Sequence, residues 1–311
     1  MHPLHIATPL LTHPALSARL GKQVLLKMEN LQPSGSFKLR GIGAMCQRAV
    51  QAGARLLVCP SGGNAGAAAA VAGAALGVPV VIVVPVTTHV SVQDKLRQFG
   101  ARVQVHGDVW DEANSFALQL CEQQGGAYVP PFDHPDIWDG NATMIDEALA
   151  QGARFDAVVC SVGGGGLMCG VLEGLHRNGM GHVPLLAVET EGAASLRAAI
   201  QAGELVTLPA ITSLATSLAA KRVAAAALEW TRRHDVRSVV VSDRQALDAC
   251  VAFADDQRAL VEPACGAALA VAYGNLPVLR EFERPLVIVC GGLAVDLAKL
   301  DGWRTSESRH A

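Results

Sequence analysis

One lysine of this chain stands where covalent chemistry is possible. Lys38 lies in the segment Ser34–Gly41, which reads SGSFKLRG. The chain has six lysines and nineteen arginines, so lysine is not its usual surface cation. A lysine amine that is neutral part of the time can form a Schiff base with an aldehyde, and arginine cannot replace it. A solvated lysine near the start of a helix explains the segment equally well.

A glycine-rich turn follows a short apolar run that ends at Cys59. The turn reads Ser61-Gly62-Gly63-Asn64-Ala65-Gly66 and precedes an alanine-rich stretch. The first backbone N–H groups of a helix have no intrahelical partner, so such a turn is a ready anion site. A substrate carboxylate is the natural guest, with Ser61 and Asn64 as additional donors. An ordinary strand-to-helix turn with an Asn cap remains the alternative.

Four consecutive glycines, Gly163, Gly164, Gly165 and Gly166, follow the apolar run Val158–Val162. Glycine is costly in chain entropy, so the run makes sense where the backbone must wrap closely around a phosphate. No Gly-Lys-Ser/Thr follows, which excludes a P-loop, and Met168 breaks the G-x-G-x-x-G pattern. A flexible turn is the alternative. Taken together, the lysine and the two glycine-rich segments suggest a lysine-bound pyridoxal phosphate (PLP).

Two further residues end apolar runs and are candidates for the same site. Cys290 precedes Gly291 and Gly292, and a side chain at the carboxyl end of a central strand points toward the ligand crevice. A thiol there could bond to the pyridine nitrogen of PLP, which favours loss of a β-leaving group over racemisation. Glu189, with nearby carbonyl groups, could hold a cation. A buried structural thiol and a solvated acidic turn are the respective alternatives.

Composition excludes several classes of function. Half of the 311 residues are hydrophobic, 17% are charged and the formal net charge is −3, so nothing indicates nucleic-acid binding. We expect no membrane segment, because no apolar run is long enough, and the N-terminus lacks the pattern of a signal peptide. The eight cysteines form no C-x-x-C pair or zinc spacing, which favours a reducing cytoplasm.

Strand-like and helix-like segments alternate along the chain, which predicts a largely parallel sheet with helices on both faces. The expected strands are Val24–Met28, Leu56–Cys59, Val80–Val84, Arg102–Val105, Ala157–Ser161, Leu185–Val188, Ser238–Val241 and Leu286–Val289. The expected helices are Lys38–Ala52, Ala65–Leu76, Ser91–Phe99, Asp108–Gln124, Ile137–Gln151, Leu167–Asn178, Val223–Arg233, Asp243–Asp255 and Cys265–Tyr273.

The number of strands is too large for one simple sheet. The proline-rich segment Pro130–Pro135 is a rigid break, because proline fixes φ and cannot continue a helix. We therefore expect a small inserted α/β domain, residues 35–134, and a large domain, residues 1–34 plus 135–311. A cleft between them is the expected place of the active site. The polar tail from Arg304 to Ala311 is expected to be frayed.

The ordered set of motifs resembles the fold type II PLP enzymes, and most closely the catabolic L-serine/L-threonine dehydratases, over nearly the whole chain. The resemblance rests on Gln32–Lys38, Ser61–Gly66, Pro130–Asp133, Ser161–Leu167, Glu262–Ala268 and Val289–Gly292. It implies a tryptophan synthase β-like α/β fold. Such a fold has two open, twisted, mostly parallel sheets with helices on both faces.

The resemblance also implies a role for each motif. Lys38 carries PLP and removes the Cα proton, Phe37 packs on the ring, and Cys290 faces the pyridine nitrogen. Asn64 bonds the ring hydroxyl, and Gly163, Gly164, Gly165 and Gly166 hold the phosphate. The substrate is bound by Ser61, Gly62, Gly63, Asn64 and Ala65, with Phe132 bordering the pocket. A potassium-type site is implied at Glu189, with carbonyl groups of Gly163, Ala193, Ser195, Leu218 and Ala220.

The implied activity is β-elimination from small amino acids, giving pyruvate and ammonia from L-serine and 2-oxobutyrate and ammonia from L-threonine. A homodimer is also implied. Two positions depart from the family pattern: Gly62 and Ser217 stand where relatives commonly have Ala. A serine or threonine racemase, a β-replacement enzyme and a non-catalytic binding protein remain alternatives. Relatives that racemise usually place Ser at the position of Cys290, and β-replacement relatives usually have Thr where Ser61-Gly62 stands.

Overall fold

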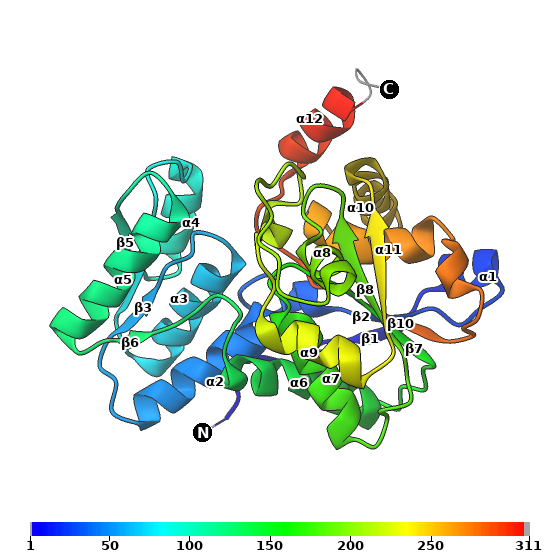
Figure 1. The fold of residues 1–311 in the computed structure, drawn as a ribbon, viewed down its shortest axis with the longest axis horizontal. Coiled ribbons are helices and arrows are strands. Elements are labelled where there is room, and N and C mark those ends of the chain that lie inside the picture. The colour runs from blue at the N-terminus through cyan, green and yellow to red at the C-terminus, as the bar shows by residue number, and fades with distance from the viewer. Residues whose placement is uncertain (1, 308–311) are drawn as a thin grey trace. The chain divides into compact units, whose positions relative to one another are not determined.

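The computed structural model describes residues 2–307, which form two compact units. The first unit comprises residues 2–6 and Gln32–Asn141, and the second comprises Ala7–Leu31 and residues 142–307. The first unit is thus mostly an insertion into the chain of the second. Helix α6 (Pro135–Ala150) begins in the first unit and ends in the second (Figure 1).

The first unit contains a parallel four-stranded sheet in the order β5-β4-β3-β6 (Figure 1). Its strands are β3 (Leu57–Cys59), β4 (Val80–Val84), β5 (Arg102–Val105) and β6 (Ala127–Tyr128). Its helices are α2 (Lys38–Gln51), α3 (Asn64–Leu76), α4 (Val90–Gln98) and α5 (Trp110–Gln124).

Alternating side chains of β4 explain why helices cover both faces of this sheet. Val81 and Val83 pack in one cluster with Ala113 and Ala117 of α5. Ile82, which lies between them in the strand, points to the opposite face. Its Cγ2 is 3.3 Å from the point that a Cβ on Gly66 of α3 would occupy. The alanine- and glycine-rich α3 can therefore lie close to the sheet.

The second unit contains a six-stranded sheet in the order β1-β2-β10-β7-β8-β9 (Figure 1). Only the β1–β2 pair is antiparallel. The strands are β1 (Leu10–Thr12), β2 (Leu25–Lys27), β7 (Ala157–Ser161), β8 (Leu185–Thr190), β9 (Val236–Val241) and β10 (Pro285–Ile288).

Helices flank this sheet as well. They are α1 (Pro14–Leu20), α7 (Gly166–Arg177), α8 (Ser195–Ala202), α9 (Ala225–Arg233), α10 (Asp243–Gln257), α11 (Pro263–Tyr273) and α12 (Leu297–Glu307), besides the second half of α6. Short 3-10 turns occur at η1 (Glu29–Leu31), η2 (Thr216–Leu218) and η3 (Pro277–Leu279). None of the helices in residues 2–307 combines the length and apolar character needed to cross a bilayer.

The register of the central strands brings three chain segments to one edge of the sheet. Val287 of β10 pairs with Val159 of β7, and Ser161 of β7 pairs with Val188 of β8. The segments that follow these parallel strands therefore leave the sheet side by side at its carboxyl edge. That edge is where ligands bind in open α/β sheets.

The predicted fold class is confirmed: the structure has two mostly parallel sheets flanked by helices. All eight expected strands are present, whereas β1, β6, α1, α8 and α12 were not expected. The expectation of a frayed tail from Arg304 is wrong up to Glu307, because α12 continues through that residue. Residues 308–311 lie outside the described part of the chain.

Candidate active site

The amine of Lys38 lies between a carbonyl group and an aromatic ring of the first unit. Lys38 is the first residue of α2, and Phe37 precedes it in helical conformation. The Nζ atom donates a hydrogen bond to the carbonyl oxygen of Pro131 at 2.6 Å and lies 5.3 Å from the centre of the Phe37 ring. Phe132, the predicted border of the substrate pocket, follows Pro131 directly. These contacts bring Phe37, Lys38 and the Pro131–Phe132 segment together.

A buried thiol at the end of β3 lies near Lys38. Burial raises the pKa of Cys59 to about 12, although the charge of Lys38 and a hydrogen bond from the Ser61 backbone N–H oppose the shift. Cys59 is therefore a neutral thiol around pH 7. Two residues after Cys59, Ser61 carries a hydroxyl group. That hydroxyl accepts a hydrogen bond from the Gly63 N–H at 3.3 Å.

The glycine-rich turn between β3 and α3 is folded tightly. A Cβ on Gly66 would lie 1.9 Å from the carbonyl oxygen of Ser61, so only glycine permits this turn. Gly63 is the N-cap of α3 and makes no side-chain cap. Asn64 and Ala65 form the first turn of the thirteen-residue helix, whose N–H groups carry partial positive charge. The structure thus gives Ser61–Ala65 the geometry of an anion-binding turn.

Gly62 is explained by packing behind the turn. A Cβ on this residue would lie 3.2 Å from both Thr88 Cγ2 and Val84 Cγ1. These neighbours belong to β4 and the segment after it, so the added methyl group would point into the sheet side of the turn. The glycine that departs from the family pattern therefore allows the turn to lie closer to β4.

In the second unit, the four glycines connect β7 to α7. Gly165, the N-cap of α7, has φ of 92°, and a Cβ there would lie 2.6 Å from the Cβ of Ala227. A Cβ on Gly163 would lie 2.9 Å from the Cα of Leu218. The carbonyl of Gly164 accepts a hydrogen bond from the Ala224 N–H at 3.0 Å. Glycine is thus required where the loop meets η2 and α9, and the loop ends at the N-terminus of a twelve-residue helix.

Cys290 follows β10 at the same edge of the sheet. By the β10–β7 register it lies level with Val162, immediately before the glycine loop. The side chains of Cys265 and Ser161 lie near it. The neighbouring side chain of Cys265 and burial both raise the pKa of Cys290 well above its usual value, so the residue is a neutral thiol.

The glycines after Cys290 leave space for a carboxylate. Gly292 has φ of 134°, and a Cβ there would lie 1.9 Å from the Cδ of Glu262. Glu262, which is 2% exposed, accepts a hydrogen bond from the Ala294 N–H at 3.3 Å. The family segment Glu262–Ala268 and the segment Cys290–Gly292 are therefore neighbours in the second unit.

Glu189 is fully buried near the end of β8. Its two carboxylate oxygens accept hydrogen bonds from the backbone N–H groups of Leu196 at 2.7 Å and Arg197 at 2.8 Å. Burial raises its pKa to about 7 despite these bonds. Beside it, the buried hydroxyl oxygen of Ser195 has no hydrogen-bond partner among the described residues. An electron-rich oxygen without a donor is compatible with a cation ligand.

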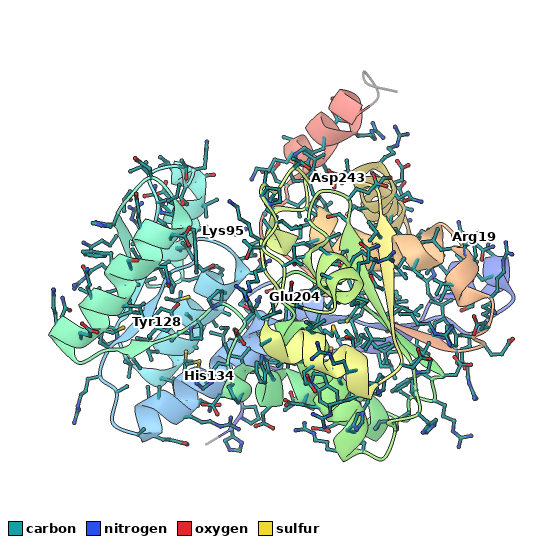
Figure 2. The ribbon with its side chains drawn as sticks, viewed as in Figure 1. Arg19, Lys95, Tyr128, His134, Glu204 and Asp243 are labelled. Atoms are coloured by element: carbon teal, nitrogen blue, oxygen red, sulfur yellow. The ribbon has the colours of Figure 1, made fainter. Side chains whose placement is uncertain are left out.

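The loop that carries Leu218 and Ala220 is braced from β8 and α10. Thr190 Oγ1 and Ser213 Oγ are 2.7 Å apart, and Ser213 donates to Asp243 Oδ1 at 2.5 Å. The other oxygen of Asp243, labelled in Figure 2, accepts the Leu214 N–H at 2.8 Å. Ala193 is tied to the same strand, because its N–H donates to the Thr190 carbonyl at 3.0 Å.

The predicted site residues thus form a set within each unit. The first unit holds Phe37, Lys38, Ser61, Gly62, Gly63, Asn64, Ala65 and Phe132. The second unit holds Gly163, Gly164, Gly165, Gly166, Glu189, Ala193, Ser195, Leu218, Ala220 and Cys290. No group of three or more His, Cys, Asp or Glu side chains within residues 2–307 is arranged to hold a metal ion.

Sequence reasoning missed four groups that contact these residues. The Pro131 carbonyl binds Lys38, Thr88 packs behind Gly62, and both Cys265 and Ser161 contact Cys290. A carbonyl group leaves no signal in a sequence. Cys265 and Ser161 lie in quoted motifs, but only the fold brings their side chains to Cys290.

Comparison with known proteins gives consistent results over almost the full length. The family model described as "Pyridoxal-phosphate dependent enzyme" matches residues 2–291. The chain is 50% identical over 314 residues to "Serine dehydratase-like" of Homo sapiens, an alignment that covers 97% of this chain and 95% of that protein. It is 47% identical over 308 residues to "L-serine dehydratase/L-threonine deaminase" of Homo sapiens, covering 96% and 94%.

Solved structures with this fold carry related names. A fungal L-serine ammonia-lyase from Rhizomucor miehei superposes with a TM-score of 0.93 at 40% identity, covering 98% of this chain and 99% of that chain. Maize serine racemase superposes with a TM-score of 0.87 at 25% identity, covering 99% and 95%. The fold alone therefore does not separate elimination from racemisation, and the higher identity lies with the ammonia-lyase.

Proposed function

Because the chain belongs to the pyridoxal-phosphate dependent enzymes, we propose that it is an L-serine/L-threonine ammonia-lyase. It converts L-serine to pyruvate and ammonia, and L-threonine to 2-oxobutyrate and ammonia. The observation that carries this function is Lys38, whose amine lies beside the Phe37 ring and the Pro131 carbonyl. The nearly complete coverage of the human dehydratase relatives supports the same reaction.

The residues of the chain fit PLP. When bound, the cofactor supplies an electron sink for the substrate's Cα. Lys38 would hold the cofactor, and its amine would accept the Cα proton of the substrate. The Pro131 carbonyl orients the amine for this task by accepting one of its N–H groups. Phe37 packs on the ring, and Asn64 bonds the ring hydroxyl.

In this proposal, residues of the second unit bind the phosphate group and the ring nitrogen of the cofactor. The N–H groups of Gly163, Gly164, Gly165 and Gly166, at the start of α7, bind the phosphate. Crowding at Gly163 and Gly165 supports this role, because a side chain at either position would displace the loop. Cys290, a neutral thiol because its pKa is raised, would face the ring nitrogen.

The substrate carboxylate is bound by the turn before α3. The hydroxyl of Ser61 and the N–H groups of Gly62, Gly63, Asn64 and Ala65 donate to it. Phe132 borders the substrate side chain. The Cα proton and the β-hydroxyl group together are lost as one water. The enamine that results tautomerises to the imine, which takes up one water and gives the 2-oxo acid and ammonia.

A monovalent cation completes the site. We take it to be K⁺, because all of its proposed ligands are oxygen atoms. Its proposed ligands are Glu189 and carbonyl groups of Gly163, Ala193, Ser195, Leu218 and Ala220. Two observations support it: the buried Ser195 hydroxyl has no partner among the described residues, and Glu189 is a fully buried carboxyl. The close approach of Gly163 to Leu218 brings two of the proposed ligands together.

We also propose that the enzyme is a cytoplasmic homodimer. All eight cysteines are free thiols, which suits a reducing compartment. Light scattering during size-exclusion chromatography tests the dimer, and a molar mass near 32.4 kDa, that of one chain, would contradict it.

The test of the reaction is an assay of the PLP-loaded protein with L-serine and, separately, with L-threonine. Equimolar 2-oxo acid and ammonia are expected. A racemase, favoured as the second candidate by the likeness to maize serine racemase, would form the D-amino acid without releasing ammonia. A protein that binds no PLP chromophore would be a non-catalytic relative, and both enzymatic proposals would fail.

A further inference from the structure

One tryptophan of the first unit holds the residue that precedes the carboxylate-binding turn. Trp110 is the first residue of α5, and its Nε1 donates a hydrogen bond to the carbonyl oxygen of Pro60 at 2.6 Å. Pro60 is buried, follows the last residue of β3 and comes directly before Ser61. A buried backbone carbonyl needs a hydrogen-bond partner, and the indole N–H supplies one beyond the end of the strand.

This hydrogen bond fixes the direction in which the chain enters the turn. Proline fixes φ, so the orientation of the peptide plane between Pro60 and Ser61 depends on ψ of Pro60 alone. A donor held against the Pro60 carbonyl removes that remaining freedom. The position of Ser61, the first residue of the turn, is therefore coupled to the indole of Trp110.

Burial alone does not account for Trp110, which is 44% exposed. Helix α5 is held on the sheet by its other face, where Ala113, Ala117 and Leu120 pack in the cluster beneath it. The hydrogen bond to Pro60 is thus the contact that distinguishes this side chain from another apolar residue at the start of the helix.

A second tryptophan holds the segment that orients Lys38. Trp138 lies in the first turn of α6, and its Nε1 donates to the carbonyl oxygen of Phe132 at 3.0 Å. Phe132 follows Pro131, whose carbonyl accepts the hydrogen bond from Lys38. At the other end of the segment, the Val129 N–H donates to a carbonyl of β3 at 2.8 Å. Both residues between Val129 and Phe132 are prolines with fixed φ, so the segment is held at both ends and has little internal freedom.

The helix that carries Trp138 also contacts the helix that carries Lys38. A Cβ on Gly140 of α6 would lie 2.8 Å from the Cα of Gly41 in α2. The N–H of Gly41 donates to Oδ1 of the buried Asn141 at 3.1 Å. The backbones of α2 and α6 are therefore in direct contact. The same pair of helices places the amine and the indole that holds the acceptor of that amine.

We propose that Trp110 and Trp138 are positioning residues for the two parts of the site in the first unit. Trp110 fixes the turn that binds the substrate carboxylate, and Trp138 fixes the segment whose Pro131 carbonyl orients the Lys38 amine. The inference rests on the proposed function, because it concerns the positioning of groups that are used there. Loss of each indole N–H impairs a different step: carboxylate binding for Trp110, and transfer of the Cα proton for Trp138.

Two probes without a β-leaving group separate these steps. L-Alanine has an amine, a carboxylate and a Cα proton, and ethylamine is the same molecule without its carboxylate. The dissociation constant of each probe is measured from the absorption spectrum of the full-length, PLP-loaded protein. NMR in D₂O follows exchange of the Cα proton of L-alanine. Exchange breaks the Cα–H bond, forms a Cα–D bond and releases HDO, so it reports proton transfer without elimination.

The variants are W110F and W138F, which keep an aromatic ring and lose the indole N–H. W230F, in α9 of the second unit, controls for the loss of a tryptophan as such. W110F should weaken L-alanine binding about fivefold, which corresponds to one hydrogen bond of about 1 kcal/mol, and leave ethylamine within about twofold. W138F should bind both probes within about twofold of the wild type, yet slow exchange at saturating L-alanine about fivefold. W230F should keep all three values.

The outcomes separate the positioning roles from the proposed function. L-Alanine binding that W110F leaves unchanged, or weakens equally with ethylamine, would overturn the role of Trp110. Unchanged exchange in W138F would overturn the role of Trp138. If a Phe variant has a lowered thermal midpoint, benzothienylalanine at that position removes the N–H, keeps the ring shape and decides by the same comparison. A wild-type protein that neither binds L-alanine nor exchanges its Cα proton would instead refute the proposed function.

Discussion

Lys38 donates a 2.6 Å hydrogen bond to the backbone carbonyl of Pro131, ninety-three positions along the chain. The bond joins the start of α2 to the segment that carries Phe132. An amine that donates one N–H group to a fixed acceptor has its lone pair held in a defined direction. This orientation suits a group that must first attack a carbonyl carbon and later accept a proton.

Replacement of Lys38 should therefore abolish the reaction while leaving the fold intact. K38A removes the amine, and K38R keeps a cation near the Pro131 carbonyl but cannot form a Schiff base. We expect both to lower kcat by at least about 10²–10⁴-fold and to remove the absorbance of covalently bound PLP. The control is the same substitution at Lys95 of α4, which is labelled in Figure 2. K95A should keep the turnover and the PLP absorbance of the wild type. Wild-type turnover by K38R would contradict the covalent role.

The packing behind Gly62 predicts a compensating pair of mutations. G62A places a methyl group 3.2 Å from Thr88 Cγ2 and should destabilise the protein by about 1–3 kcal/mol, the usual range for overpacking. T88S removes that Cγ2 atom and should restore part of the lost stability and of kcat/KM for L-serine. Urea denaturation of the two single variants and the double variant measures the coupling. Strictly additive free energies would mean that the two side chains do not meet.

The buried carboxyl of Glu189 predicts a pH-dependent response to K⁺. Its pKa is raised from 4.5 to about 7 in the folded protein. A raised pKa means that the folded state holds the proton more tightly than the unfolded state. The contribution to stability is thus present below about pH 4.5 and is lost as the pH rises through about 7. A cation beside the ionised carboxylate should offset this loss.

Thermal midpoints in potassium chloride and in tetramethylammonium chloride test that expectation. K⁺ should raise the midpoint at about pH 8 and have little effect at about pH 5, where the carboxyl is protonated. E189Q should remove the difference, whereas E191Q, at an exposed neighbouring position, should retain it. An equal effect of K⁺ on the wild type and E189Q would place the cation elsewhere.

The contact of α10 with α11 predicts a strongly destabilising substitution outside the site. A Cβ on Gly266 would lie 2.2 Å from the carbonyl oxygen of Ala246 and 2.5 Å from Cys250 Sγ. Because one of these atoms belongs to a helix backbone, the helices must separate. We expect G266A to cost about 1–3 kcal/mol, measured by urea denaturation. G302A, with no atom near its added Cβ, is the control.

The parts of the fold that could be predicted are those with a strong local pattern. The apolar runs at Val80–Val84 and Ala157–Ser161 are strands with the predicted bounds. By contrast, β6 has only two residues, Ala127–Tyr128, and forms because β3 offers it a pairing edge. Helix α8 is eight residues long, and its first N–H groups are satisfied by Glu189, a contact that no local pattern reveals.

The resemblance to the dehydratase family, inferred from ordered motifs, is confirmed by the family match and by the relatives. The individual roles of Lys38, Cys290 and Glu189 stay predictions. Sequence could indicate these side chains because their types are chemically distinctive. It could not indicate that α11 brings Cys265 near Cys290, since this contact depends on tertiary packing.

The pairing of β2 with β10 has a consequence for how the chain acquires its structure during synthesis. Leu25 pairs with Leu286, so the antiparallel pair of β1 and β2 has no neighbouring strand on the β2 side until almost the whole chain has left the ribosome. The insertion that forms the first unit, with strands β3 to β6, is complete by residue 141. The inserted unit can therefore fold first, while the β1–β2 pair keeps an unpaired strand edge until β10 has been synthesised.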